Sequence, residues 1–369
     1  NPQPNMTDKM STNLESEEDE APIMPAISND VAVNILARMP RLHHPTLSLV
    51  SKGFRSVIDS HILYTTRSLG GFARPFLYLC IRVSFPIPSN AWFILHLTPG
   101  TAPKPVSLPP TPNTLIGSAY SSVGPKIYVV GGSAAGLPTR AVYRLDCRTH
   151  KWALAPTMRV AREFAAVGTV DGKVYVIGGC LEDTRTRSRH WAEVFDPESG
   201  MWSQIDSVEE VDVREKWMHA SAVMKGKIFA MADRSGFAFE PRTSRWEFVK
   251  GKLNEGWRGR ACVVNGVLYC YNYLGKIQGY DAEAEEWKVL RGVEDKVPRF
   301  LCEPMLTDFG GNLFVTWGSK SGEKETIIFG AEIAIRNEKE EIWGRVLWCN
   351  SFLTVPSQSS VLCCLSVVL

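Results

Sequence analysis

The sequence predicts a small all-α module followed by an all-β propeller, because a short helical pattern precedes a series of repeated strand-turn units. Four Trp residues mark the repeat, at positions 152, 202, 246 and 287. Each ends a similar phrase: YRLDCRTHKW, EVFDPESGMW, FAFEPRTSRW and QGYDAEAEEW. A period of about 40 to 50 residues with strand and turn chemistry is typical of propeller blades. The fixed position of each Trp predicts a packing role between blades.

Each unit of the repeat contains a tight turn between two apolar strands. Gly and Asn accept positive φ, so pairs of this kind favour hairpin turns, here Asp171-Gly172, Lys225-Gly226, Asn265-Gly266 and Gly310-Gly311. The strands that follow are KIYVVGG (126–132), KVYVIGG (173–179), KIFAMAD (227–233), VLYCYN (267–272) and NLFVTWG (312–318). These segments predict five units. The Gly-Gly pair that ends the first two strands is lost in the third and fourth units.

A sixth blade is predicted from the two ends of the propeller region, 75–369. Segments 77–83 and 91–97 have the pattern of two strands, with Trp92 near the closing position. We expect 351–356 and 360–369 to supply two more. Joining both ends of the chain in one blade closes the ring and removes exposed strand edges. Six blades are therefore favoured, with five as the alternative, and the Pro-rich segment 99–113 is predicted to be an extended connector.

The helical module covers 25–70 and follows an acidic tail, 1–24, that we expect to be disordered. Ser28 or Asn29 is placed to cap a first helix, which Pro40 ends. Pro45 suits the first position of a second helix. On that helix, apolar residues recur at steps of three and four and predict one buried face: Leu47, Val50, Phe54, Val57 and Ile58.

Composition excludes several classes of function. A formal net charge of +2 gives no electrostatic reason to expect a nucleic-acid or membrane partner, and no segment has the pattern of a transmembrane span. Nine Cys without a CxxC pair predict free thiols in a reducing compartment. We therefore expect an intracellular protein of the cytoplasm or nucleus. The sequence begins with Asn, which leaves its true start open between this residue, Met6 and Met10.

The repeat resembles the kelch repeat, through the Gly-Gly pairs at 131–132 and 178–179 and the Trp that ends each unit. The segment ISNDVAVNILARMPRLHHPTLSLVSKGFRSVI (27–58) resembles an F-box. The two in this order are similar to the plant F-box/kelch-repeat proteins. That resemblance implies an F-box that docks a Skp-type adaptor, and through it a cullin, and a propeller that binds a target protein for ubiquitination.

The same resemblance implies which F-box residues face the adaptor: Ile27, Ser28, Val31, Ile35, Pro45, Leu47, Val50, Lys52 and Phe54. Two positions depart from the usual F-box pattern. Ile27-Ser28 stands where Leu-Pro is usual, and Phe54 stands where Trp is common. Losing the Pro removes some rigidity from the entry to the helix. The alternative to a ligase subunit is therefore a kelch-repeat scaffold with a degenerate F-box.

Two basic features are candidates for target binding. Arg185, Arg187 and Arg189 lie in the loop TRTRSRH, which is either a solvated loop or a site for an acidic or phosphorylated partner. Arg162, His219, Arg258 and Arg260 fall near the entries to the first strands of three successive units. That second group predicts either a positive ring at the central channel or structural ion pairs.

Motifs for catalysis, metal or cofactor binding do not emerge. Gly131 and Gly136 have P-loop spacing, but Leu137 occupies the place that requires Lys. The His residues are scattered, apart from the adjacent His43 and His44, and HExxH does not occur. We therefore predict a non-enzyme without catalytic residues, metal or cofactor. An enzyme or small-molecule receptor that uses the channel is a third hypothesis.

Overall fold

The computed structural model describes residues 22–84, 86–97, 101–180, 190–206, 218, 220–232, 235–338 and 341–369. The chain divides into two compact units, with the boundary between Phe72 and Ala73. The predicted acidic tail lies outside the described residues up to position 21.

The N-terminal unit is helical. Its elements are α1 (Asn29–Arg38), the 3-10 helix η1 (Arg41–His43), α2 (His44–Leu47), α3 (Lys52–Asp59) and α4 (His61–Leu69). Ser28 occupies the N-cap position of α1 without a side-chain bond to the helix, and α1 ends before Pro40 as predicted. The core of the unit is formed by Ala32, Leu36, Ala37, Val57, Ile58, Leu63 and Tyr64.

The predicted second helix is interrupted, which corrects the prediction of one buried face. Pro45 lies in the first turn of the short helix α2, but the chain turns after Leu47. The Ser51 hydroxyl then accepts a hydrogen bond from the Phe54 amide at 3.1 Å and starts α3. Val57 is buried, whereas Val50 is 63% exposed. The periodicity is real within α3 but does not extend through the turn before it.

A buried arginine holds the end of α1. The Arg67 guanidinium donates hydrogen bonds to the carbonyls of Ala37 at 2.7 Å, Met39 at 2.8 Å and Phe72 at 3.0 Å. Helix C-termini leave carbonyls without intrahelical partners, and a cation there also suits the helix dipole. Arg67 on α4 therefore joins the first and last helices of the unit.

The C-terminal unit contains six groups of four strands, which we number as blades in chain order. Blade 1 comprises β4 (Ala119–Val123), β5 (Lys126–Val130), β8 (Val142–Asp146) and β9 (Lys151–Ala155). Blade 2 comprises β10 (Ala166–Val170), β11 (Lys173–Ile177), β12 (Ala192–Asp196) and β13 (Met201–Ile205). Blade 3 comprises β14 (Ala220–Met224), β15 (Lys227–Ala232), β16 (Ser235–Glu240) and β17 (Arg245–Phe248).

Blades 4 and 5 share one eight-stranded sheet. Blade 4 comprises β18 (Ala261–Val264), β19 (Val267–Tyr271), β20 (Ile277–Asp281) and β21 (Glu286–Arg291). Blade 5 comprises β22 (Cys302–Phe309), β23 (Asn312–Ser321), β24 (Glu325–Glu338) and β25 (Glu341–Pro356). A short parallel bridge between β21 and β25 joins their outer strands. The short hairpin β6 (Ser133–Ala134) and β7 (Leu137–Pro138) and the helix α6 (Gly251–Gly256) lie between strands of the blades.

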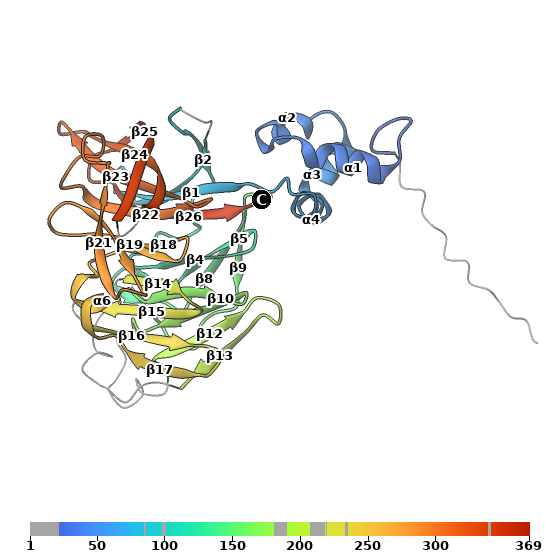
Figure 1. The fold of residues 1–369 in the computed structure, drawn as a ribbon. Helices are drawn as coiled ribbons and strands as arrows, with labels where there is room; N and C mark the ends of the chain where they lie inside the picture. Colours follow the sequence, from blue (N-terminus) through green and yellow to red (C-terminus); the bar gives the residue numbers. More distant parts are fainter. Residues whose placement is uncertain are drawn as a thin grey trace, which may run out of the picture. The chain divides into compact units, whose positions relative to one another are not determined.

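The closing blade confirms that the propeller has six blades. It has the order β26 (Ser360–Val368), β1 (Pro75–Val83), β2 (Ser89–His96) and β3 (Lys104–Leu108). Figure 1 shows β26 beside β1, and the two are antiparallel, with Cys80 opposite Cys363. The first strand of each blade contacts the first strand of the next, and β26 contacts β4. The two ends of this unit therefore close one ring.

Two details of the predicted closing blade were wrong. Segment 351–356 belongs to β25 and so to blade 5, because that strand runs without a break from Glu341 to Pro356. The fourth strand is instead β3, inside the segment predicted as a connector. Pro105 lies in β3 opposite Leu95. Proline is tolerated there because β3 is an edge strand, whose outer side needs no ladder hydrogen bonds.

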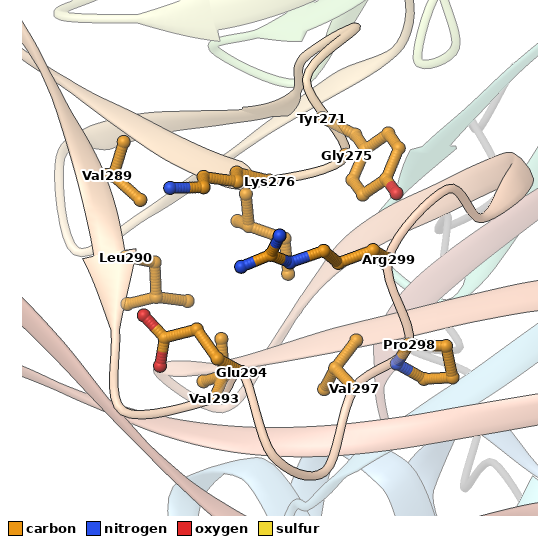
Figure 2. A pocket seen from close by; sticks show the side chains of 11 residues that line it. Tyr271, Gly275, Lys276, Val289, Leu290, Val293, Glu294, Val297, Pro298 and Arg299 are labelled. Carbon is orange, nitrogen blue, oxygen red and sulfur yellow. The ribbon is translucent and has the colours of Figure 1, made fainter.

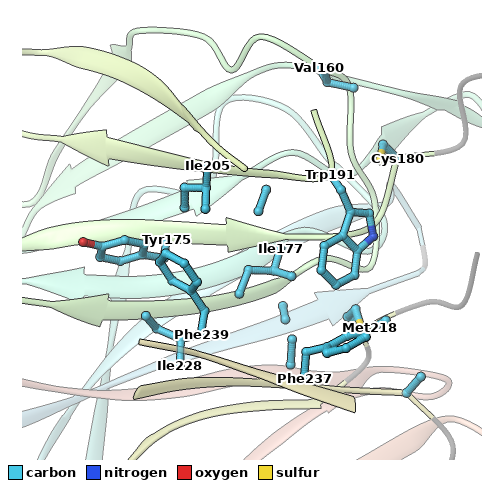
Figure 3. Packing of buried hydrophobic residues seen from close by; sticks show 14 of the residues in the cluster. Val160, Tyr175, Ile177, Cys180, Trp191, Ile205, Met218, Ile228, Phe237 and Phe239 are labelled. Carbon is cyan, nitrogen blue, oxygen red and sulfur yellow. The ribbon is translucent and has the colours of Figure 1, made fainter. Parts of the chain in front are cut away.

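The repeated Trp residues tie each blade to the segment that leads into it. Their indole N–H groups donate to backbone carbonyls: Trp152 to Pro109, Trp202 to Pro156, Trp246 to Asp206 and Trp287 to Lys252, at 2.6–2.9 Å. Other aromatic rings pack between blades. Figure 3 shows Trp191 of blade 2 facing Phe237 of blade 3, with ring centroids 5.8 Å apart.

Candidate protein-interaction sites

The predicted adaptor-facing residues of the helical unit lie on its surface. Val31 is 48% exposed, Ile35 42% and Val50 63%, and Ser28, Pro45 and Lys52 are also exposed. Ile27, Leu47 and Phe54 are half-buried. Exposed apolar groups that gather on a small unit indicate a surface for a partner. The core of the unit uses none of these nine side chains.

Two further apolar residues of this region are exposed and were not predicted. Leu42 lies on η1 and is 60% exposed, and Leu49, in the turn before α3, is 74% exposed. Sequence periodicity gave no signal for them because both lie outside a regular helix. They add to the exposed apolar side chains of the helical unit.

His44 is buried beside two cations and is not available to a partner. Desolvation by burial, together with the charges of Arg67 and Arg41, lowers its pKa from 6.5 to about 4. A neutral imidazole is the favoured form in such a site. His44 is therefore part of the packing that supports the exposed surface.

The structure places Arg162 in the interior of blade 2, which contradicts its prediction as a target-binding residue. Its side chain is 1% exposed, and its guanidinium donates to Glu193 at 3.0 Å, to the Gly178 carbonyl at 2.7 Å and to the Trp191 carbonyl at 2.8 Å. It also donates to the carbonyl of His190. The alternative of a structural ion pair is therefore correct for Arg162, because every direction of its planar fork already meets an acceptor.

Arg258 and Arg260 lie close to the surface near the start of blade 4. Arg258 is half-buried and donates to the carbonyl of Trp257 at 2.7 Å. Arg260 is exposed and donates to the Leu362 carbonyl of β26 at 2.8 Å. Arg162, with its interior position, does not join these two in a ring. Arg185, Arg187, Arg189 and His219 lie outside the described residues.

A pocket in blade 4 was not predicted (Figure 2). It is a small, shallow hollow, open to solvent, between the loop that joins β19 to β20 and the segment that follows β21. Ile277, Leu290, Val293 and Val297 supply apolar side chains, and Lys276, Glu294 and Arg299 supply charges. The sequence gave no signal, because these residues come from two strands and the segments beside them, with no shared motif.

The residues that the structure describes hold no cluster of three or more His, Cys, Asp or Glu side chains that could ligate a metal ion. Within the same residues, no helix is long and apolar enough to cross a membrane.

A helical unit with an exposed apolar surface, joined to a six-bladed propeller, defines a two-part protein-interaction chain. An F-box domain model matches residues 25–66, and the model of the FKB95 kelch-repeats domain matches 92–353. The chain belongs to the F-box/kelch-repeat family, and this combination of domains fits a substrate adaptor of Skp–cullin–F-box complexes.

Relatives from Arabidopsis thaliana match over nearly the whole chain. The F-box/kelch-repeat protein At4g39550 is 38% identical over 93% of each chain. The F-box/kelch-repeat protein At4g39590 is 35% identical over 91% of this chain and 88% of its own. A third relative, At4g39570, is 33% identical over 90% of this chain and 89% of its own. The same two-part order therefore extends across these proteins.

Proposed function

We propose that this chain is the substrate-recognition subunit of an SCF-type ubiquitin ligase. The F-box would dock a Skp-type adaptor and through it a cullin, and the propeller would bind the protein to be ubiquitinated. The observation that carries the proposal is the exposure of three apolar side chains of the F-box, Val31, Ile35 and Val50. Leaving such groups in water costs free energy that a docked partner would recover.

The mechanism needs no chemistry from this chain. Holding a target beside a ubiquitin-conjugating enzyme raises the effective concentration of the reacting groups, and this alone accelerates transfer. We infer a cytoplasmic or nuclear site of action, which is supported by the free state of the nine cysteines.

The two departures from the usual F-box pattern are compatible with docking. Ser28 leaves α1 without a side-chain cap, yet Asn29 accepts a hydrogen bond from the Ile23 amide at 2.9 Å and fixes the chain before the helix. Phe54 is half-buried and keeps an apolar ring at its position. The alternative of a scaffold with a degenerate F-box predicts the same fold and differs only in adaptor binding.

A direct binding measurement tests the proposal. The full chain, a chain lacking residues 1–70 and the Val50→Asp variant are each tested for capture of a purified Skp-type adaptor. We expect capture by the full chain only, because a carboxylate at position 50 would be desolvated in the interface. Ile62→Asp is the matched control, since Ile62 is 53% exposed but lies on α4, outside the predicted surface. Equal capture by Val50→Asp and the full chain would contradict the predicted surface.

Failure of the intact, folded chain to capture any adaptor would instead support the free scaffold. Circular dichroism of each variant establishes that the F-box is still folded. Arg258, Arg260 and the loop with Arg185, Arg187 and Arg189 remain predicted target-facing residues. The experiment above does not depend on them.

A further inference from the structure

Blade 4 presents large apolar side chains to solvent on the loop that joins β19 to β20. Tyr273 is 76% exposed and Leu274 is 62% exposed. In blades 1 and 2 the corresponding segment begins with Gly131-Gly132 or Gly178-Gly179, which have no side chains to present. Exposed aromatic and aliphatic groups side by side on a loop indicate a contact surface.

The loop is held in one conformation by Asn272. This residue is 7% exposed, and its Oδ1 accepts hydrogen bonds from the amides of Leu274 and Lys276, both at 3.0 Å. Its Nδ2 donates to Oε1 of Gln278 at 2.9 Å. Binding by a loop that is already ordered loses less conformational entropy. The position of Tyr273 is therefore set before any partner arrives.

A second loop, which adjoins the first at Gly275, adds another exposed aromatic ring. Phe300 is 74% exposed, and a Cβ placed on Gly275 would lie 3.0 Å from the Phe300 amide nitrogen. The next amide, of Leu301, donates to the Tyr271 hydroxyl at 2.7 Å and fastens this loop to β19. The two loops thus form one continuous surface.

The pocket beside these rings carries a small positive excess. Lys276, Arg299 and Glu294 all line it, and Figure 2 shows the Arg299 guanidinium extending into the hollow. No ion pair within 4.0 Å engages either cation in the described parts of the chain. Two cations and one carboxylate leave room for one further negative charge. A guanidinium pairs well with a carboxylate, in two parallel hydrogen bonds.

We propose that the target protein docks on this surface through a segment that places an Asp or Glu side chain next to a large apolar residue. We call it the Tyr273 surface and define it by Tyr273, Leu274, Lys276, Arg299 and Phe300. The carboxylate binds at the surface of the pocket, against Arg299 and Lys276, and the apolar residue packs on Tyr273 and Phe300. This inference rests on the proposed function, because it identifies the class of segment that the ligase subunit would recognise.

The charge balance favours a carboxylate over a phosphate. A carboxylate brings one negative charge, which the excess of one cation compensates. A phosphorylated side chain brings nearly two at neutral pH and would lie beside the Glu294 carboxylate, whose repulsion it would have to overcome. The surface therefore selects for Asp or Glu.

A displayed library of random 12-residue peptides, selected on the full chain, tests the inference. We expect enrichment of sequences in which Asp or Glu is within two residues of Leu, Ile, Phe or Trp. A synthetic peptide from that selection should bind Arg299→Glu and Tyr273→Ala at least tenfold more weakly than the unmodified chain. The affinity for Lys320→Glu should be unchanged, because this control makes the same charge change at an exposed position of β23.

Changes to the peptide and a measurement of the oligomeric state distinguish a carboxylate segment from a phosphorylated segment or a second copy of the chain. Replacing the peptide's Asp by Asn should reduce binding at least tenfold, and replacing it by phosphoserine should not improve binding. Selection without an acidic consensus, equal binding by Arg299→Glu, or tighter binding of the phosphoserine peptide would each overturn the inference. So would a dimer of the chain, by light scattering, that dissociates in Tyr273→Ala.

The two proposals fail separately. Adaptor capture without peptide selection removes the Tyr273 surface and leaves the ligase subunit in place. Peptide binding as expected, without adaptor capture, leaves a propeller with the same recognition site on a free scaffold.

Discussion

Blades 2 and 4 have the same strand order but different interiors at the same position of the repeat. The first residue of the phrase that ends in Trp is Glu193 in blade 2 and Gln278 in blade 4. Glu193 forms a buried ion pair with Arg162, 3.0 Å long. Gln278 instead accepts from Asn272 and donates to the Gly256 carbonyl at 2.7 Å. A buried ion pair stabilises the interior of blade 2, whereas hydrogen bonds of neutral amides stabilise that of blade 4.

The segments that follow the second strands of blades 2 and 4 also differ, in how much space they leave for side chains. Gly178 and Gly179 of blade 2 both have positive φ, and a Cβ on Gly179 would lie 2.4 Å from the Glu163 carbonyl oxygen. Backbone therefore fills the space above blade 2. In blade 4, Asn272-Tyr273 stands in that place: the Asn272 side chain is buried within the loop, and the Tyr273 side chain is exposed. The comparison teaches that a repeat departs from its consensus where side chains take on another role.

The largest expected effect comes from Arg162→Met in blade 2. The change leaves the Glu193 carboxylate buried without its partner, which should lower the free energy of unfolding by about 3–5 kcal/mol. Denaturant unfolding of the full chain measures it. Arg162→Met combined with Glu193→Leu should recover most of the loss. If the double variant is as unstable as the single one, the loss of stability does not come from the unpaired Glu193 carboxylate.

Gly179→Ala should come next, at about 2–4 kcal/mol. It combines a disfavoured positive φ for Ala with overlap against a backbone oxygen that cannot move aside cheaply. Gly172→Ala is the matched control, because Gly172 also has positive φ but open space at the Cβ position. It should cost only about 1 kcal/mol. Equal losses in the two variants would show that close packing above blade 2 is unimportant.

Asn272→Ala tests whether the side-chain hydrogen bonds of Asn272 hold the loop of blade 4 in place. Three hydrogen bonds of the loop are removed, and we expect a loss of about 2 kcal/mol in unfolding free energy. Hydrogen exchange of the Leu274 and Lys276 amides should accelerate strongly, while amides of blade 2 keep their protection. Unchanged exchange at these two amides would mean that the loop is ordered by something other than Asn272.

The smallest effect is expected from the Trp residues that end blades 2 and 4. Trp202→Phe removes the hydrogen bond to the Pro156 carbonyl from a side chain that is 7% exposed, and should cost about 1–2 kcal/mol. Trp287→Phe removes the equivalent bond to Lys252 at a half-buried position and should cost less, about 1 kcal/mol. Thermal unfolding of both variants measures the order, and a reversed order would contradict the ranking by burial.

Sequence reasoning recovered the architecture but not the contents of the sites. The spacing of Trp152, Trp202, Trp246 and Trp287 predicted the propeller, and the resemblance to an F-box gave the order of the two units. It misplaced one strand of the closing blade, because the prolines around β3 hide an edge strand. It also left Arg162 open between a ring at the channel and a structural ion pair, since the period along the chain does not say whether a side chain points inward or outward.

The sequence by itself determined the helical unit and the strand-turn repeat, because each rests on patterns local to about 50 residues. It left the number of blades open between six and five, because the closing blade pairs β1 with β26 from the other end of the unit. The tertiary structure alone decided which charges are buried and which are presented. Arg162 forms an ion pair with Glu193 of β12. Lys276 and Arg299, which lie on different segments of the chain, line the same pocket. These contacts depend on how separate segments of a blade pack together, and no local sequence pattern encodes the distance between their side chains.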